Sequence, residues 1–328
     1  FVGTGTTAND VDNKNLEAGS TNNVIGDAAS AGGLTNGTAG NFVGDGGSGV
    51  RDINTILDTT LQDNGGPTFT HALVSGSVAI DAGNNALAVD ASMNPLSTDQ
   101  RGTGFTRFLG TVDIGAFEAI PTNLLVDIAT DENDGDYSAG DLSLREAILL
   151  ANTLADANTI QFDAMLSGET ITLGGTELSI ENDLNIIGLG ADQLTISGND
   201  QSRIFEITSG TTASISGLKL TDGNVNGDDG GAIRSYGTLT VTNSTISGNS
   251  AGYDGGGIWS SGSLTVTNST ISGNSAGYDG GGIFSSATST VTNSTISGNS
   301  AGYDGGGIFN LDDSTTIINS TITGNRAD

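Results

Sequence analysis

Hydrophobic and polar residues alternate in short runs along the C-terminal part of the chain. In one such run, Leu264 and Val266 are separated and flanked by Ser and Thr residues. A period of two is that of a strand with one buried face, and β-branched Thr and Ile favour the strand conformation. Glycine runs and Ser-Gly-Asn segments interrupt the alternation, as turns do. The pattern therefore predicts many short strands separated by turns.

The same pattern recurs with a period of 25 residues. Residues 243–267 and 268–292 differ at four of 25 positions, and a third copy begins at Asn293 and slips by one residue near its end. A more diverged copy precedes them, so that repeats cover residues 229–328. We expect three short strands in each copy, coiled once per repeat and paired with the next coil at about 4.8 Å.

A single repeat is too small to fold alone. Its four buried aliphatic residues contribute on the order of 6–12 kcal/mol. Ordering one repeat costs about 1 kcal/mol or more per residue in backbone entropy. Stacking supplies the difference through hydrogen bonds between coils and continuous aliphatic columns. The sequence therefore predicts an all-β fold, a right-handed parallel β-helix with coils of about 25 residues.

Asparagines occupy two positions of every repeat. Because equivalent residues of successive coils lie above one another, we predict two ladders in which each amide bonds its neighbour and the turn backbone. These structural ladders are Asn243, Asn268 and Asn293, and Asn249, Asn274 and Asn299. The Asn-Ser-Thr strings also match the N-glycosylation acceptor. The ladder interpretation is favoured because the spacing follows the repeat.

One segment has helical periodicity. Leu144, Ala147, Ile148 and Ala151 recur at helical spacing, and the Ser at 143 followed by the Glu at 146 forms a capping box. We predict one short helix near 143–155. Its apolar stripe would cover the open end of the solenoid, where exposed strand edges invite pairing.

Composition excludes several classes of function. The chain has 38 acidic against 9 basic residues, a net charge of -29, so it cannot neutralise phosphate and we predict no nucleic-acid partner. No apolar run is long enough for membrane insertion. The absence of Cys excludes disulfides and thiolate metal sites, and the single His71 excludes a cluster of histidines around zinc.

Several segments together resemble a known family. Leu142-Ser143-Leu144-Arg145-Glu146-Ala147, then GETITL, SRIFEI and the GGGI repeats, are similar to bacterial extracellular β-helix proteins that open with a Cys-Ser-Leu-Arg-Glu-Ala motif. Leu142 replaces the Cys of that motif, which suits a helix needing only an apolar residue there. Residues 63–118, with DNGGPTFTHAL, GSVAIDAG and DIGAFE, resemble the closing segment of the same family. The resemblance implies an extracellular or cell-surface location in a bacterium.

The closing segment precedes the opening segment in this chain. We therefore expect residues 1–120 to be the late coils and terminal cap of one β-helix unit. Residues 121–142 would form a junction and acidic loop, and residues 143–328 the capping helix and opening coils of the next unit. The order indicates one window on a tandem array. The expected partners are copies of the chain itself, head to tail along the β-helix axis.

Two sets of acidic residues are candidate calcium sites. The first is a loop with alternating oxygen ligands around Gly135, although it lacks the bidentate Glu of an EF-hand. It contains Asp131, Asn133, Asp134, Asp136 and Asp141. The second and weaker set recurs one coil apart and consists of Asp229, Asp254, Asp279 and Asp304. The alternatives are a solvated loop for the first set and, for the second, hydrogen bonds from the following glycine N–H groups.

Two aromatic columns follow the repeat. Trp259, Phe284 and Phe309 each come next to an inward Ile, so we expect them to point outward as a covered stripe or a docking stripe. Tyr253, Tyr278 and Tyr303 form the second column, and sugar binding to these rings is the weaker interpretation. In the closing segment, we predict a structural salt bridge between Arg101 and either Asp113 or Glu118.

Polysaccharide-active β-helix proteins need carboxylates beside Lys, Arg or His. Only Lys219, Arg203, Arg234 and Arg326 are basic in the coils, and near-identical coils do not suit a singular catalytic site. We therefore predict no enzyme and no catalytic residues. The function predicted is a structural or adhesive extracellular protein that forms a rod or filament by continuous or head-to-tail stacking of β-helix coils. The alternative is a carbohydrate-binding or polysaccharide-active β-helix with surface polysaccharide as its partner.

Overall fold

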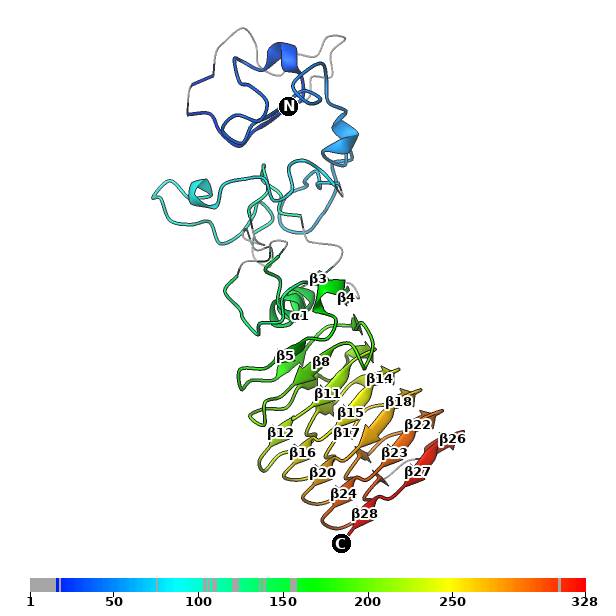
Figure 1. Ribbon diagram of the computed structural model, residues 1–328. Helices are drawn as coiled ribbons and strands as arrows, with labels where there is room; N and C mark the ends of the chain where they lie inside the picture. Colours follow the sequence, from blue (N-terminus) through cyan, green and yellow to red (C-terminus); the bar gives the residue numbers. More distant parts are fainter. Residues whose placement is uncertain are drawn as a thin grey trace. The chain divides into compact units, whose positions relative to one another are not determined.

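The chain folds into two compact units, shown in Figure 1. The computed structural model describes residues 16–17, 19–74, 76–102, 105, 107, 111–119, 124–135, 137, 140–153, 158–311 and 314–328. One unit comprises residues 1–121 with 135–138, and the other comprises residues 122–134 with 139–328. The segment 121–142 is thus divided between them, with most of its residues in the second unit.

The described part of the first unit is mostly loops and turns. Its two strands, β1 (Val24–Ile25) and β2 (Phe42–Val43), pair in parallel. The side-chain oxygen of Asn41 accepts from the backbone N–H and the side-chain amide of Asn23, at 3.1 and 2.8 Å. Three 3-10 helices complete it: η1 (Ala28–Ser30), η2 (Ile53–Thr55) and η3 (Asn85–Leu87). The described residues of this unit thus hold one pair of parallel strands, and the assignment of residues 1–120 to late coils stays a prediction.

The second unit is a right-handed parallel β-helix of about six coils, with about 26 residues per turn. Its strands form four sheets, and every pair is parallel. The first sheet contains β3 (Leu124–Val126), β4 (Asn158–Phe162), β7 (Leu184–Ile187), β10 (Thr212–Ser216), β14 (Thr238–Thr242), β18 (Leu264–Thr267), β22 (Ser289–Thr292) and β26 (Thr315–Ile318). The second contains β5 (Thr170–Thr172), β8 (Thr195–Ser197), β11 (Lys219–Thr221), β15 (Thr245–Ser247), β19 (Thr270–Ser272), β23 (Thr295–Ser297) and β27 (Thr321–Thr323).

The other two sheets close each coil. The third contains β6 (Leu178–Ile180), β9 (Phe205–Ile207), β13 (Ile233–Ser235), β17 (Ile258–Ser260), β21 (Ile283–Ser285) and β25 (Ile308–Asn310). The fourth contains β12 (Asn224–Val225), β16 (Ser250–Ala251), β20 (Ser275–Ala276), β24 (Ser300–Ala301) and β28 (Arg326–Ala327). Regular coils therefore have four strands where the sequence predicted three. The additional strand is a Ser-Ala pair, too short to produce an alternating pattern.

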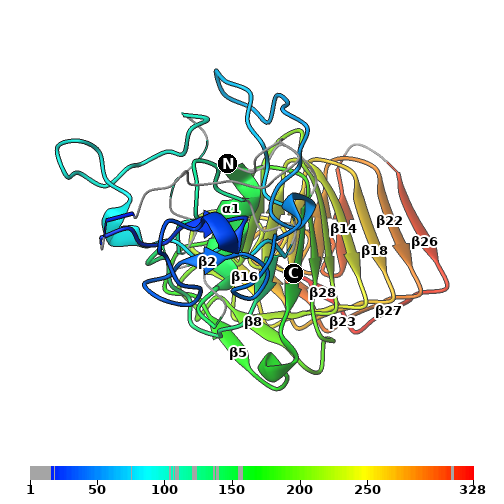
Figure 2. The same ribbon diagram turned by 90° about the horizontal axis from the view of Figure 1, so that it is seen from above.

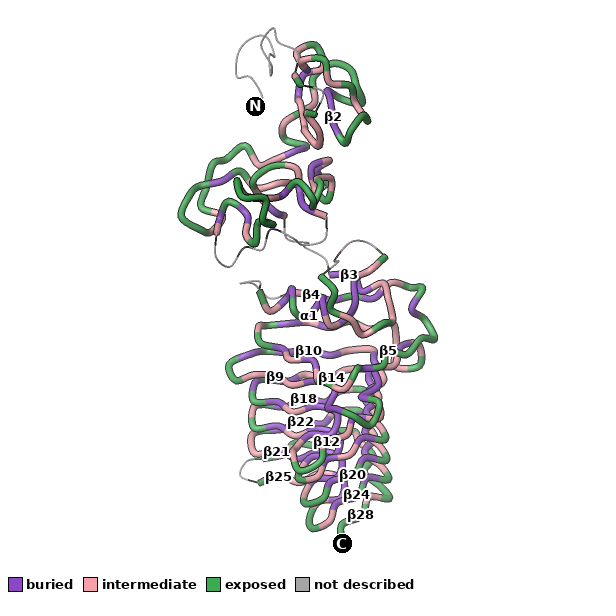
Figure 3. The backbone as a smooth tube through the Cα atoms, turned by 90° about the vertical axis from the view of Figure 1, so that its left-hand side faces the viewer, coloured by how far each residue is buried: buried purple, intermediate pink, exposed green. Residues whose placement is uncertain are grey.

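Aliphatic columns fill the interior of the solenoid. Ile246 pairs with Ile271, which in turn pairs with Ile296, and all three are fully buried. Figure 3 shows buried positions recurring along most strands of the solenoid. The predicted inward faces of these strands are therefore correct. The core does not need large side chains, because each aliphatic side chain packs on its equivalents in the coils above and below.

A tight turn within each coil explains the first glycine of each run. Gly255 has a φ of +68°, and a Cβ there would lie 2.5 Å from the carbonyl oxygen of Ile258. Gly280 repeats this geometry in the next coil, with φ of +66° and the same 2.5 Å approach to Ile283. Any larger residue at either position would clash and take up a strained backbone conformation. The glycines thus let the chain turn tightly from the Asp column into the third sheet.

The helix α1 (Leu144–Thr153) lies at the first coils, against β3, β4 and β6 (Figure 1). Its buried residues include Leu144, Ala147, Ile148 and Ala151, as the predicted stripe requires. The capping box is formed: Ser143 Oγ accepts from the Glu146 N–H at 3.1 Å, and Glu146 accepts from the Ser143 N–H at 3.2 Å. Within the described part of the chain, the helices are too short or too polar to cross a bilayer.

Candidate functional site

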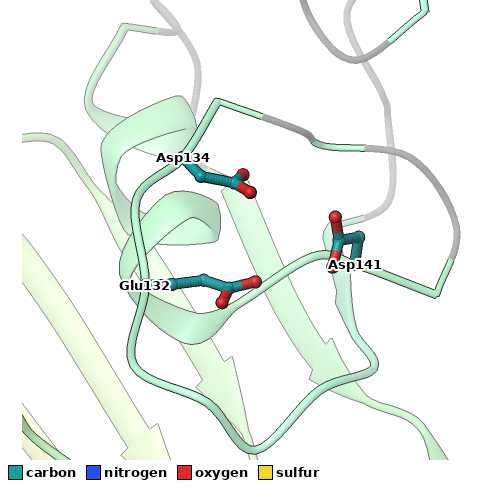
Figure 4. Close-up of side chains that lie close together, drawn as sticks. All are labelled: Glu132, Asp134 and Asp141. Carbon is teal, nitrogen blue, oxygen red and sulfur yellow. The ribbon is translucent and has the colours of Figure 1, made fainter.

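Three carboxylates converge in the acidic loop between β3 and α1. Glu132, Asp134 and Asp141 each offer an oxygen atom, and these atoms lie within 4.8 Å of one another. Figure 4 shows Glu132 and Asp134 on one limb of the loop, facing Asp141 on the other. Asp127, at the start of the loop, accepts hydrogen bonds from the N–H groups of Gly140 and Leu142, and Ser143 Oγ joins the limbs by donating to the Glu132 carbonyl oxygen at 2.8 Å. This group is called the loop carboxylates below.

The rest of the predicted loop set lies elsewhere. Asp131 pairs with Arg145, with Nε–Oδ1 at 2.7 Å, and accepts from the Gly174 N–H at 2.7 Å. Asn133 is exposed, and Asp136 lies outside the described residues. Because side chains alternate along an extended segment, Asp131 facing Arg145 places Glu132 and Asp134 on the opposite side. The sequence prediction missed Glu132, although its spacing of two from Asp134 was the available signal.

The electrostatics of the loop suit a cation. Partial desolvation, and then the carboxylates of Asp141 and Asp134, raise the pKa of Glu132 above its ordinary value. Either a proton or a positive ion would relieve this repulsion. Carboxylate oxygens on a loop are the ligands that Ca²⁺ prefers. The residues that could hold calcium are therefore Glu132, Asp134 and Asp141.

The Asp column is satisfied by the backbone. Asp229 Oδ1 accepts from the Asp254 N–H at 3.0 Å, and Asp254 Oδ1 accepts from the Asp279 N–H at 2.9 Å. The same bond joins Asp279 to the N–H of Asp304. The glycine N–H groups expected to serve these carboxylates instead donate to carbonyls of the next coil, as Gly255 does to Asp279. Partial burial raises the pKa of Asp254, and the hydrogen bond from the Asp279 N–H opposes this rise. The neighbouring carboxylates of Asp229 and Asp279 raise the pKa further.

The two Asn columns behave differently. Asn249 Nδ2 donates to Asn274 Oδ1 at 2.9 Å, and Asn274 Nδ2 donates to Asn299 Oδ1 at the same distance. Each amide is fully buried and also donates to a backbone carbonyl of the preceding coil. This ladder is present as predicted.

The other predicted ladder is not formed. Asn243, Asn268 and Asn293 are exposed and have φ values of 50°, 51° and 50°. Among the described residues, no side-chain hydrogen bond joins them. The left-handed conformation turns the chain from the first sheet into the second, and it points these amides to solvent. The prediction was wrong because a turn that needs Asn for its backbone does not need the amide as a partner.

Two aromatic columns run along the coils. The rings of Trp259 and Phe284 stack with centroids 6.2 Å apart, and those of Phe284 and Phe309 with centroids 5.5 Å apart. They lie on the outer side of the third sheet, opposite buried Ile258 and Ile283. Neighbouring rings cover much of each ring face, and Phe284 is only 6% exposed. The tyrosine column is more open, since Tyr253, Tyr278 and Tyr303 are all exposed.

A charged network on the third sheet was missed by sequence reasoning. Arg203, only 2% exposed, pairs with Glu177, with Glu206 at 3.5 Å and with Asp228 at 2.9 Å. Arg234 pairs with Glu206 at 2.9 Å and with Asp228 at 2.6 Å. These five residues are called the arginine network below. They come from coils of irregular length, so the sequence spacing gave no signal that they would meet.

Two carboxyl groups of the arginine network differ in acidity. Burial, and then a hydrogen bond with Glu206, raise the pKa of Glu177, while Arg203 opposes the rise. Burial raises the pKa of Glu206, but hydrogen bonds with Glu177 and Arg234 outweigh burial and hold this pKa below the ordinary value. The two carboxylates share the guanidinium of Arg203. Each nitrogen of Arg203 already has an acceptor within the chain, so the arginine binds neighbouring coils together.

The first unit has a separate ion-pair network. Arg101 pairs with Asp99 at 2.6 Å, and its guanidinium lies over the rings of Phe105 and Phe117. Glu118 instead pairs through its carboxylate with Arg107 at 3.0 Å. The predicted partner of Arg101 was therefore wrong, since only the backbone carbonyl of Glu118 contacts it. Asp99 was closer in sequence and could bond both the backbone and the side chain of Arg101.

The four parallel sheets and their in-register columns define a β-helix repeat protein. The comparison with known families agrees, because residues 166–327 match the family model for a right handed beta helix region. No curated protein and no solved structure matched the chain.

Proposed function

We propose that the chain is a structural segment of a bacterial extracellular rod or filament, of the kind that forms a surface fibre, a sheath or a matrix. The observation that carries the proposal is the unbroken register of the coils. Ile233 pairs with Ile258, Ile258 with Ile283, and Ile283 with Ile308, so that successive coils add without insertions in the third sheet. A stack of coils in this register can be lengthened by adding further coils. The resemblance of the opening segment to bacterial extracellular β-helix proteins supports the location.

The last described coil suits further stacking. Ile317 and Ile322 occupy inward columns, since they pair with Val291 and Ile296. Their equivalents are fully buried, whereas Ile317 and Ile322 are 46% and 43% exposed. A further coil would bury these residues and pair the edges of β26 and β27. We assign that coil either to residues that continue the β-helix in a longer chain or to a second copy of the chain, joined head to tail.

Sedimentation and negative-stain electron microscopy of the full chain would test the proposal. We expect concentration-dependent linear assemblies. Ile322→Lys should abolish them, because it places a charge on the stacking surface. Thr323→Lys is the matched control, because Thr323 lies next in the same strand but points outward, and this variant should still assemble. A chain that stays monomeric at every concentration, or equal assembly of both variants, would contradict head-to-tail stacking.

The arginine network favours a second candidate function, the binding or cleavage of a polysaccharide. Glu177 and Glu206 provide an acid and a base side by side, and Tyr236 lies between Arg234 and Trp259. Affinity electrophoresis against neutral and acidic polysaccharides, followed by analysis of reducing ends, distinguishes the two candidates. Retardation or cleavage that Glu206→Gln removes would favour this second function over the rod.

A further inference from the structure

The outer face of the first sheet carries a regular grid of threonines. Thr240 and Thr242 point outward from β14, and the same two positions of β18 and β22 are also threonines. The six residues, called the threonine array, are Thr240, Thr242, Thr265, Thr267, Thr290 and Thr292. Figure 2 shows β14, β18 and β22 side by side in this sheet.

The hydroxyl groups of the array are free to bind an external partner. All six side chains are half-buried, and within the described part of the chain their hydroxyls make no hydrogen bond. Each can donate and accept. Threonine is stiff at χ1, and the ladder fixes its backbone, so the hydroxyls and methyls are held in place before any partner binds. Little ordering entropy remains to be lost on binding.

Charge is absent from this face, although the chain carries a net charge of -29. The outward positions of β7, β10, β14, β18, β22 and β26 are Asn, Ser, Thr or Ile. Acidic columns run elsewhere, at Asp254 and its equivalents. An uncharged partner is therefore favoured. Aromatic rings, which commonly stack on sugars, lie on the third sheet rather than here.

The spacing of the array is close to that of crystalline water. Adjacent coils are about 4.8 Å apart, and residues two apart in a strand are about 6.6 Å apart. Tetrahedral water with O···O bonds of about 2.75 Å has second neighbours about 4.5 Å apart and a hexagonal-axis repeat of about 7.3 Å. Both spacings agree to within about a tenth. We propose that the threonine array binds ice, with the hydroxyls in the hydrogen-bonded lattice and the methyls between them.

Two measurements on the full chain would test the proposal: the gap between freezing and melting temperatures, and partition of the protein into a slowly growing ice surface. We expect the wild-type chain to produce a freezing gap and to enter the ice. Thr265→Tyr should lose both, because a ring protrudes from the centre of the array while Tyr remains a good strand residue. Ser261→Tyr, at an exposed turn of the same coil, is the matched control and should retain both.

Circular dichroism melting would establish that both variants fold, and Thr265→Lys gives a second disruption of the array through charge. The proposal would be overturned by a wild-type chain with no freezing gap, or by a folded Thr265→Tyr chain that equals the wild type. Adsorption to crystalline cellulose or chitin without adsorption to ice would also overturn it, in favour of a polysaccharide partner.

Discussion

At the scale of single residues, position within the coil decides what an asparagine contributes. Asn274 is buried and accepts from both the backbone N–H and the side-chain amide of Asn249. Asn268, six residues earlier, is exposed and serves only a left-handed turn. A buried amide is costly unless all its bonds are made, whereas an exposed amide loses little when it is removed. The two columns should therefore differ greatly in their effect on stability.

Replacing Asn274 with Ala should lower the free energy of unfolding by about 3 kcal/mol or more. The change leaves the buried backbone N–H of Asn249 without its acceptor, and it removes the bonds from the Asn274 amide to the Ile246 carbonyl and to Asn299 Oδ1. Asn268→Gly, which keeps the left-handed turn available, should stay within about 0.5 kcal/mol of the wild type. Urea denaturation followed by circular dichroism measures both. Equal losses would show that the buried rungs do not stabilise the solenoid.

Calcium should raise the melting temperature of the wild-type chain, because a cation among the loop carboxylates binds the folded state only. Glu132→Gln should reduce this rise, whereas Glu169→Gln, an exposed glutamate on the solenoid, should leave it unchanged. Differential scanning calorimetry in millimolar calcium and in chelator provides the comparison. An identical melting temperature in the two solutions would contradict calcium binding.

The same loop predicts a pH effect in chelator. Folding raises the pKa of Glu132, so the stability linked to this group is fully present below its unfolded-state pKa. That stability is lost as the pH rises through the folded-state pKa. Wild type should therefore lose more stability than Glu132→Gln between acidic and neutral pH. A larger loss in the variant would mean that the shift has the opposite sign.

At the scale of the elements, the spacing of strands along the chain was easier to predict than the side to which loop residues point. The period of the strands, the capping helix and the inward aliphatic columns follow from neighbouring residues, and the structure has them. The phase of the acidic loop does not, because Arg145 on α1 decides which side Asp131 takes. The arginine network could not be predicted from neighbouring residues either, because its members lie in coils of unequal length. Local patterns determine local structure, while these sites depend on contacts distant in sequence.

Placing a charge at Ile271 tests the face assignment of β19. Ile271 is fully buried between coils, whereas Ser272 points outward and is half-buried. Ile271→Asp should cost several kcal/mol, because an unpaired carboxylate in an aliphatic column has no partner. Ser272→Asp should cost much less. Thermal melting of the two variants decides the matter, and similar melting temperatures would refute the assignment.

At the scale of the whole molecule, each column of the repeat continues as a line of one chemical kind. Threonine hydroxyls follow the first sheet, aromatic rings the third, and carboxylates the turn before it. The first unit does not share this order among its described residues, apart from the single Asn23–Asn41 rung. Its structure was less predictable, since it depends on buried ion pairs between loops rather than on a repeated pattern.

The constant offset of 25 residues between equivalent positions determines how the solenoid can change in length. From Thr245 to Thr270 and on to Thr295, the strand partners are displaced by one copy of 25 residues, and neighbouring copies are nearly identical. Insertion or deletion of one copy keeps the register and most contacts, because the new neighbours present nearly the same residues. Molecules that differ in copy number should therefore have solenoids whose lengths differ in steps of about 4.8 Å, with the same kinds of residues on each face.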